Sequence, residues 1–369
     1  MIKKMFLEDC CEILDSQRVP ITAANRTEGP YPYYGANGVQ GYVADYIFDD
    51  ELVLLAEDGG NFGSKIKPIA YRTSGKCWVN NHAHVLKPKN GLDVDFLCYS
   101  LMFYNTDGLV NGATRQKLTQ ATMRKMLIPA LPIEHQIEVV SQLNKIKEIK
   151  DLRMREIQKL DDLVRSRFVE MFGDPEENQF EWITSTVGNL ISSCEAGWSG
   201  NGTQRKKNDG EIAVLKVSAV TKGYFDPDEC KVLDDQDAIK KYVYPQAGDL
   251  LFSRANTREM VGATAVITQD YPEHILPDKL WKVRFCDVAN VWYMKYILSS
   301  QSIRSIFSSV STGTSGSMFN VSMEKFKSIR VPLPPIELQQ QFADFVAQVD
   351  KSKVAVQKIF KISHFNGII

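Results

Sequence analysis

Few residue groups in this sequence have the types and spacing that catalysis requires. The segment Pro227-Asp228-Glu229-Cys230-Lys231 contains the letters of a metal-dependent nuclease site. Its two carboxylates are neighbours in the chain, so they cannot hold Mg²⁺ from two separate strands as such a site requires. The chain also has no Gly-x-x-x-x-Gly-Lys-Ser/Thr phosphate loop and no Asn-Pro-Pro-Tyr type motif of amino-methyltransferases. We therefore predict no catalytic residue and no cofactor.

Two histidines, His82 and His84, have the spacing of a metal half-site, because alternate residues of a strand point to the same face. No third ligand stands at a matching spacing, so a structural or DNA-facing role is favoured over metal binding. The seven cysteines form no Cys-x-x-Cys pair, which indicates reduced, mostly buried thiols and no structural zinc. We predict that the chain holds no metal.

Polar loops point to a different chemistry. Arginine, lysine, asparagine, serine and threonine recur where strands are expected to end, and these side chains contact phosphates and read base edges. Any one of them is more often part of a polar surface turn, but their recurrence at corresponding places in two halves of the chain favours DNA binding for the set. The candidate DNA-binding residues are Asn61, Lys65, Lys67, Asn80, Asn81, His82, Thr114, Arg115, Lys117, Asn201, Arg205, Lys206, Arg254, Asn256, Arg258, Lys279, Ser317 and Asn320.

Bulk composition restricts the class of protein. A chain of 369 residues is long enough for two domains, and 44% hydrophobic with 24% charged residues is typical of a globular protein. The formal net charge of −1 argues against a protein that coats nucleic acid without sequence preference, but it is compatible with local basic faces. The sequence contains no apolar run long enough to span a membrane and no signal-peptide core at residues 1–9, so we expect a cytoplasmic protein without a membrane partner.

Short strands must position the loops of the first half. Runs typical of strands cover 42–43, 46–48, 52–55, 69–71, 77–79 and 83–86, separated by clusters rich in glycine, asparagine and proline. A helix is predicted over 93–103, with Asp93 or Asp95 as its N-terminal cap. We expect a mixed α/β domain over residues 1–130.

After Pro132 the hydrophobic period becomes that of a helix. Apolar residues recur at spacings of three to five up to position 171, and positions 134–170 carry eight acidic and eight basic residues. A narrow apolar stripe on a charge-balanced surface favours pairing with another helix over binding to a membrane. Forty residues of helix would be roughly 60 Å long. The segment is therefore predicted to be a strut, which Gly173-Asp174-Pro175 is expected to end.

This strut and the hinge before it are duplicated. Ile128-Pro-Ala-Leu-Pro-Ile-Glu-His-Gln136 returns 203 positions later as Val331-Pro-Leu-Pro-Pro-Ile-Glu-Leu-Gln339, followed by a second helical run. Two helices with matching stripes can pair antiparallel and bury those stripes together. We predict an α+β protein with mixed α/β domains over 1–130 and 173–332, each followed by a long helix, over 131–172 and 333–369.

Several segments carry a resemblance to a known family. They are Tyr-Pro-Tyr-Tyr-Gly-Ala-Asn-Gly at 31–38, Gly-Tyr-Val-Ala-Asp-Tyr-Ile at 41–47, 54–59, 78–85 and Phe-Val-Glu-Met-Phe-Gly-Asp-Pro at 168–175. Together with the duplicated Pro-Ile-Glu-x-Gln hinge, they make the sequence similar, over nearly its whole length, to the specificity subunits of type I restriction-modification systems.

The resemblance implies two repeated target-recognition domains, each reading one half of a split sequence in double-stranded DNA. Two long antiparallel, coiled-coil-like helices would set the gap between the half-sites and dock two modification (methyltransferase) subunits. Restriction/translocase subunits would join through the complex, and the methyl donor and ATP would belong to these partners. The second helix is shorter, so its docking surface is either complete or finished by another chain. The implied docking residues are Ile133, Ile137, Val140, Leu143, Ile146, Leu160, Val164, Phe342, Val346 and Val349.

Two other functions stay open at the level of sequence. One is a self-contained DNA-modifying enzyme with an unrecognised catalytic site. The other is a two-headed scaffold whose domains bind proteins or glycans. Sequence-selective DNA binding without methyl transfer or cleavage by the isolated chain would separate a recognition subunit from both.

Overall fold

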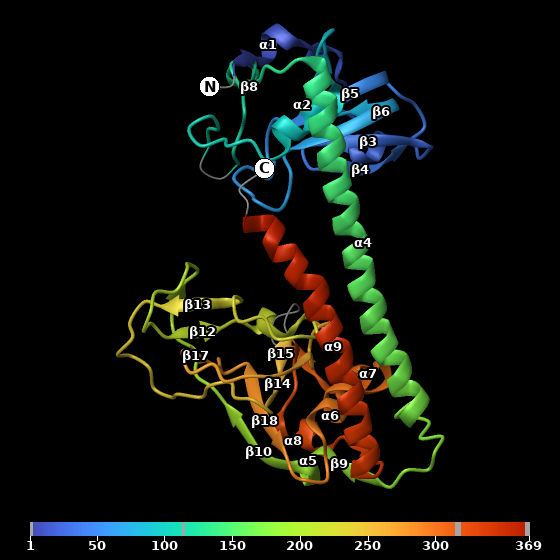
Figure 1. Ribbon diagram of the computed structural model, residues 1–369, viewed down its shortest axis with the longest axis vertical. Helices are drawn as coiled ribbons and strands as arrows, with labels where there is room; N and C mark the ends of the chain where they lie inside the picture. Colours follow the sequence, from blue (N-terminus) through green and yellow to red (C-terminus); the bar gives the residue numbers. More distant parts are fainter. Residues whose placement is uncertain (1–2, 113–114, 314–318, 366–369) are drawn as a thin grey trace. The chain divides into compact units, whose positions relative to one another are not determined.

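The computed structural model describes residues 3–112, 115–313 and 319–365. They form two compact units, Met1–Asp151 and Leu152–Ile369, which we call the first and the second unit (Figure 1). Both units mix helices and strands, and the long helix α4 (Ile133–Phe172) contributes its N-terminal part to the first and its C-terminal part to the second. Among the described residues, none of the helices has both the length and the apolar character to cross a membrane.

A six-stranded sheet organises the first unit. Its strands lie in the order β2-β7-β5-β6-β3-β4, in which β3 is parallel to β6 and the other neighbours are antiparallel. Their bounds are Cys11–Ile13 (β2), Tyr31–Gly35 (β3), Gly38–Val43 (β4), Phe48–Ala56 (β5), Ala70–Val79 (β6) and Ala83–Pro88 (β7). A separate antiparallel pair joins β1 (Lys4–Phe6) to β8 (Leu127–Pro129).

Strand β5 is buried on both faces of this sheet. Leu52 and Leu54 contribute to one core cluster, whereas Val53 and Leu55 contribute to another, together with Leu97 of helix α2 (Val94–Met102). Successive side chains of a strand point to opposite faces, so a strand covered on both sides needs a continuous apolar run. The helices α1 (Leu7–Cys10) and α3 (Gln120–Arg124) complete the unit.

The strands are longer than the sequence predicted. The end of the first run, at Phe48, and the run at 52–55 belong to the single strand β5, and residues 70–71 and 77–79 belong to β6. Both strands continue through polar residues because they pair as a hairpin from Phe48↔Cys77 to Leu55↔Ala70. Main-chain pairing does not require apolar side chains, so composition alone splits such strands.

Smaller sheets build the second unit. A four-stranded sheet has the order β10-β18-β14-β16, a second has β11-β13-β12-β17, and a three-stranded sheet has β15-β20-β19. The bounds are Ile191–Ala196 (β10), Gly202–Thr203 (β11), Ala213–Leu215 (β12), Cys230–Leu233 (β13), Leu250–Ser253 (β14), Ala255–Asn256 (β15), Thr264–Val266 (β16), His274–Ile275 (β17), Leu280–Phe285 (β18), Thr312–Gly313 (β19) and Phe319–Asn320 (β20). A pair joins β9 (Thr184–Thr186) to β21 (Arg330–Pro332).

Strand β14 occupies the place in the second unit that β5 occupies in the first. Leu250 and Phe252 lie in one core cluster and Leu251 lies in another, so the same alternation recurs. The helices are α5 (Val187–Leu190), α6 (Val291–Leu298), α7 (Gln301–Val310), α8 (Met323–Ser328) and α9 (Ile336–Phe365). Asn290 caps α6 through the Trp292 N–H, as Asp93 caps α2 through the Phe96 N–H. The predicted Asp93 cap is therefore confirmed.

Each long helix is tied to its unit by a buried glutamine. The Gln136 amide accepts from the Asp93 N–H at 2.8 Å and donates to the carbonyls of Gly91 and Leu131. Its counterpart in the second hinge, fully buried Gln339, follows the same scheme. Oε1 accepts from the Asn290 N–H at 2.8 Å, and Nε2 donates to the carbonyls of Val288 and Pro334.

Within the second unit, the end of α4 packs antiparallel to α9 (Figure 1). The rings of Phe172 and Phe342 lie 5.6 Å apart, and Lys353 Nζ lies 2.7 Å from the Asp161 carboxylate. The contacts step backwards along α4 as they step forwards along α9, which defines the antiparallel direction. Helix α4 ends where Gly173 adopts a positive φ of 74°, a conformation that glycine permits at low cost.

Candidate nucleic-acid interface

Three chain segments meet at the end of β5 in the first unit. The Glu57 N–H donates to the His82 carbonyl at 2.9 Å, and the Leu118 N–H donates to the Glu57 carbonyl at 2.7 Å. We call this meeting point, with residues 57–59, 82 and 115–118, the first junction. It places side chains from three distant loops on one small surface.

The second unit repeats this arrangement at the end of β14. The Arg254 N–H donates to the Lys279 carbonyl at 3.1 Å, and the Val321 N–H donates to the Arg254 carbonyl at 2.8 Å. We call residues 254–258, 279 and 319–321 the second junction. The same backbone frame thus presents Glu57, His82 and Lys117 in the first unit, and Arg254, Lys279 and Asn320 in the second.

Charged side chains pair with one another on the first junction. Asp58 Oδ1 lies 2.6 Å from His82 Nδ1 and accepts a hydrogen bond of 2.9 Å from Arg115. Lys117 Nζ lies 3.1 Å from the carboxylate of Glu57. Three candidate DNA-binding residues, His82, Arg115 and Lys117, are therefore brought together, each beside a carboxylate that the sequence had not singled out.

A buried network supports this junction from below. His84 is fully buried, with Nδ1 at 2.7 Å from the Asp15 carboxylate and Nε2 at 2.9 Å from the Leu118 carbonyl. Arg18 donates to Glu57 at 2.7 Å and lies beside Asp15. Burial alone would raise the pKa of Asp15, but hydrogen bonds from His84, the Val85 N–H and other donors lower it below its usual value.

The histidine pair does not act as one group. His82 lies at the junction surface beside Asp58, whereas His84 is buried and hydrogen-bonded to Asp15. The ligand atoms of Asp15, Glu57 and His84 do gather within 4.8 Å of one another. Arg18 lies among them and forms ion pairs with both carboxylates, and a fixed cation there opposes binding of a metal ion.

Cations on the second junction have a different environment. The Arg254 guanidinium lies 5.8 Å from the centre of the Trp281 ring, and that of Arg258 lies 4.8 Å from the Phe319 ring. The Nε atom of Arg254 is enclosed, and it has no hydrogen-bond partner among the described residues. Asn256 and Asn320 lie on the paired strands β15 and β20, where Asn256 is opposite Phe319 and Asn320 is opposite Ala255. Arg254, Asn256, Arg258, Lys279 and Asn320 thus form a second cluster of candidates.

Other candidates lie away from the junctions or have structural contacts. Asn61 Nδ2 donates to the Pro68 carbonyl and so closes the loop that carries exposed Lys65 and Lys67. Asn80 is buried and accepts from the His82 N–H, whereas Asn81 is exposed. Two candidates, Thr114 and Ser317, lie outside the described residues.

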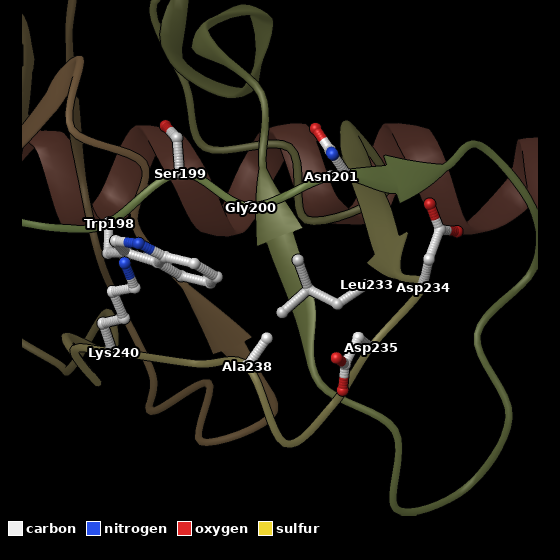
Figure 2. A pocket seen from close by; sticks show the side chains of 9 residues that line it. All are labelled: Trp198, Ser199, Gly200, Asn201, Leu233, Asp234, Asp235, Ala238 and Lys240. Carbon is white, nitrogen blue, oxygen red and sulfur yellow. The ribbon is translucent and has the colours of Figure 1, made fainter.

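Arg205 forms a bidentate surface pair with Glu211, and this pairing lowers the pKa of Glu211 to about 2. Lys206 is exposed. Asn201 borders a pocket of about 520 Å³. Figure 2 shows the Trp198 ring and the Leu233 side chain directed toward each other in this pocket. Two aspartates, Asp234 and Asp235, also line it, and their negative charge disfavours a phosphate ligand there.

The stripe residues proposed for docking divide into two groups. Val140, Val164, Phe342, Val346 and Val349 are buried in the cores of their own units, which removes them from any exposed docking surface. Ile137 and Ile146 are exposed, at 55% and 48%. Ile133, Leu143 and Leu160 are half-buried. A helical period identifies one face, but it does not tell whether this chain or a partner covers that face.

Several supporting residues were missed from the sequence. Glu57 and Asp58 hold the cations of the first junction, but the search for DNA contacts considered mainly cations and amides. Gln136 and Gln339 were visible as repeated letters, yet the repeat was assigned only to a hinge. The cue was available, because a polar residue kept at one place in two apolar hinges is typical of a buried hydrogen-bonding role.

Comparisons with known proteins agree with this architecture. A family model described as the type I restriction modification DNA specificity domain matches residues 2–161 and 181–362. A putative type I restriction enzyme specificity subunit of Haemophilus influenzae is 25% identical over 363 residues, which cover 96% of this chain and 88% of that protein. The EcoKI specificity subunit of Escherichia coli is 24% identical over 351 residues, covering 86% and 75%.

Solved structures show the same fold. The crystal structure of the type I restriction-modification S subunit from M. genitalium aligns with a TM-score of 0.52 and 13% identity, covering 98% of this chain and 92% of that one. The family match takes in most of the sequence, in two consecutive segments. The chain therefore belongs to the family of type I restriction-modification DNA specificity domains, which confirms the resemblance seen in its sequence.

Proposed function

We propose that this chain is the recognition subunit of a type I restriction-modification complex and binds double-stranded DNA at a bipartite sequence. In this proposal residues 1–130 and 173–332 are two repeated target-recognition domains, each reading one half-site. The observation that carries the proposal is the pair of junctions, in which one backbone frame holds two different sets of side chains. Two modules of one design with different contact residues suit a target with two different halves.

Spacing of the half-sites would come from the two long helices. In α4, every residue from 144 to 152 is exposed, so this segment contributes nothing to either core and can serve as a spacer. A rigid helical spacer converts protein length into base-pair separation, as half-site spacing does in dimeric DNA-binding proteins.

Modification subunits, two in the complete complex, would dock on exposed residues of the long helices. Ile137 and Ile146 are the members of the predicted docking set that are most accessible. Exposed apolar residues also occur in the middle of α4, namely Ile149, Leu152 and Met154. Methyl transfer, ATP hydrolysis and cleavage would belong to the modification and restriction/translocase subunits. This chain would supply recognition and no catalytic residue.

Selection from random DNA tests the proposal. The chain is purified alone and with its methyltransferase partner, and bound duplexes are sequenced after selection at several salt concentrations. We expect the complex to enrich two short sequence blocks separated by a constant gap. Enrichment of no bipartite sequence would reject the recognition role. Methyl transfer or cleavage by the isolated chain, abolished by a point change, would instead support a self-contained enzyme.

A further inference from the structure

The two junctions share their backbone but differ in the charge that they leave unpaired. Position for position, Glu57 corresponds to Arg254, and His82 corresponds to Lys279, because each pair makes the same main-chain hydrogen bond. In the third segment, Leu118 and Val321 donate the corresponding main-chain hydrogen bonds. The residue before this donor is Lys117 in the first unit and Asn320 in the second. An acidic residue thus stands at the centre of one junction and a basic residue at the centre of the other.

Charges on the first junction are largely cancelled within the chain. The Glu57 carboxylate lies between Arg18 at 2.7 Å and Lys117 at 3.1 Å. The Asp58 carboxylate lies at 2.6 Å from His82 and 2.9 Å from Arg115. An approaching phosphate would have to compete with these carboxylates for the same cations, so the surface offers little net attraction.

The second junction lacks this compensation. Arg254, Arg258 and Lys279 form no ion pair with any carboxylate in the described parts of the chain. The Asp278 carboxylate, next to Lys279 in sequence, accepts a hydrogen bond from the Ser199 hydroxyl. Glu259 is an acidic neighbour of Arg258, and a main-chain N–H and Thr257 hold its carboxylate and lower its pKa. Three cations therefore remain available to an external anion.

Arg254 is the best-positioned of the three cations. Its main chain is hydrogen-bonded on both sides, to Lys279 and to Val321, so the base of the side chain is fixed. The guanidinium is half-buried beside Trp281, and its enclosed Nε–H has no acceptor among the described residues. Because the guanidinium has no carboxylate partner in the described parts of the chain, its terminal N–H groups can bind an external anion without breaking an ion pair.

We propose that the second junction is the principal DNA-phosphate anchor of this chain, with Arg254, Arg258 and Lys279 binding backbone phosphates. The first junction contributes little to the electrostatic part of binding. The cluster combines arginine and lysine side chains that have no carboxylate partner in the described parts of the chain. A phosphate can bind either cation, whereas a base edge requires a fixed pattern of donors and acceptors, so phosphate is the favoured ligand. This inference rests on the proposed DNA-recognition function, and it adds an asymmetry between the two units.

Salt dependence of DNA binding tests the asymmetry. The complex with the methyltransferase partner is titrated with its selected duplex and with a random duplex between about 50 and 200 mM salt, the range over which phosphate contacts dominate the change in affinity. We expect Arg254→Gln and Lys279→Gln each to reduce the slope of log affinity against log salt by about one. Both should weaken binding to the two duplexes alike, and Arg254→Lys should retain the slope.

Matched variants serve as controls. Lys117→Gln in the first junction should change the slope by less than half as much as Lys279→Gln. Lys222→Gln should leave it unchanged, because Lys222 is a surface residue paired with Asp226 away from the junction. Lys279 has no side-chain hydrogen bond among the described residues, so its variant keeps the test valid even where Arg254→Gln fails to fold.

Two results would overturn the inference: an equal slope change for Lys117→Gln and Lys279→Gln, or weakening confined to the selected duplex, which indicates base reading. Both are distinct from failure of the recognition function itself. If the recognition function itself failed, the complex that contains the natural chain would select no bipartite sequence at all.

Discussion

Gln136 and Gln339 hold the turn before each long helix in the same way. Each amide uses its oxygen for the N–H of a helix-capping residue and its nitrogen for two carbonyls. Both glutamine side chains are fully buried, so replacing either removes three hydrogen bonds to the main chain. The glutamine of each Pro-Ile-Glu-x-Gln hinge thus holds the N-terminal end of a long helix against the unit that precedes it.

Gln136→Ala should destabilise the first unit by about 2–3 kcal/mol, because three hydrogen bonds from a fully buried side chain to the main chain are lost. Denaturant unfolding of the full chain, compared at the transition of the first unit, measures the effect. Gln142→Ala is the matched control, since Gln142 is an exposed glutamine on the same helix, and it should change stability by less than about 0.5 kcal/mol. Equal stabilities of the two variants would contradict the proposed role of Gln136.

Because of Asp15, we expect the free energy of unfolding of the first unit to decrease in acid. Its pKa is lower in the folded protein than its ordinary value of 3.8, mainly because the donors around it outweigh the effect of burial. A lowered pKa means that the ionised carboxylate stabilises the fold above about pH 4, and that this contribution is lost as the pH falls further.

Asp15→Asn should therefore cost about 3 kcal/mol at pH 7, since it removes one partner of a buried ion pair. The difference between the natural chain and the variant should shrink steadily below pH 4. Unfolding curves of both proteins between pH 3 and pH 7 give the comparison. A difference that stays constant across this range would show that the carboxylate charge is not what stabilises the network.

Among the secondary-structure elements, α9 packs against both α6 and the end of α4 in the second unit. Phe342 is fully buried, and its ring lies within 5.6 Å of the rings of Phe168, Phe172 and Tyr296. This aromatic cluster holds the beginning of α9 against the end of α4 and against α6. The C-terminal helix is therefore part of the core of the second unit.

Phe342→Ala should destabilise the second unit by about 3–5 kcal/mol, the usual cost of deleting a buried phenylalanine side chain. Thermal unfolding measures the loss, and limited proteolysis should release α9 earlier than in the natural chain. Val169→Ala removes an apolar side chain from the same region of α4, but Val169 is 55% exposed, so it should be nearly neutral. Comparable losses for both variants would argue against a stabilising role of the aromatic cluster.

For the whole molecule, the proposed spacer role of α4 can be tested by changing its length. Residues 144–152 are all exposed, so an insertion near Lys150 disturbs neither core. Four added residues complete slightly more than one turn and lengthen the helix by about 6 Å. At about 3.4 Å for each base pair, the gap between half-sites should grow by one or two base pairs while the bases read remain the same.

Selection from random duplexes with the inserted variant and its methyltransferase partner provides the measurement. Co-purification with that partner, together with an unchanged unfolding curve, establishes that the variant is folded. An unchanged gap in such a folded variant would reject the spacer role of α4.

The sequence by itself determined the order of the parts and the family. Helical period, glycine and proline positions and the duplicated hinge depend on neighbours a few residues apart, and such local patterns survive in any reading of the chain. They predicted a long helix over 131–172, a cap at Asp93 or Asp95 for the preceding short helix, and a recognition function without a catalytic motif.

Only the tertiary structure decided which charges and apolar residues remain available. Glu57 meets Arg18, His84 and Lys117 because strand pairing brings distant segments together, and no local pattern encodes those meetings. The same is true of the stripe, in which Val140 and Val164 turned inward while Ile137 and Ile146 stayed exposed. The type of a side chain can be read from the sequence, but whether that side chain is buried or already paired depends on contacts between distant segments of the fold.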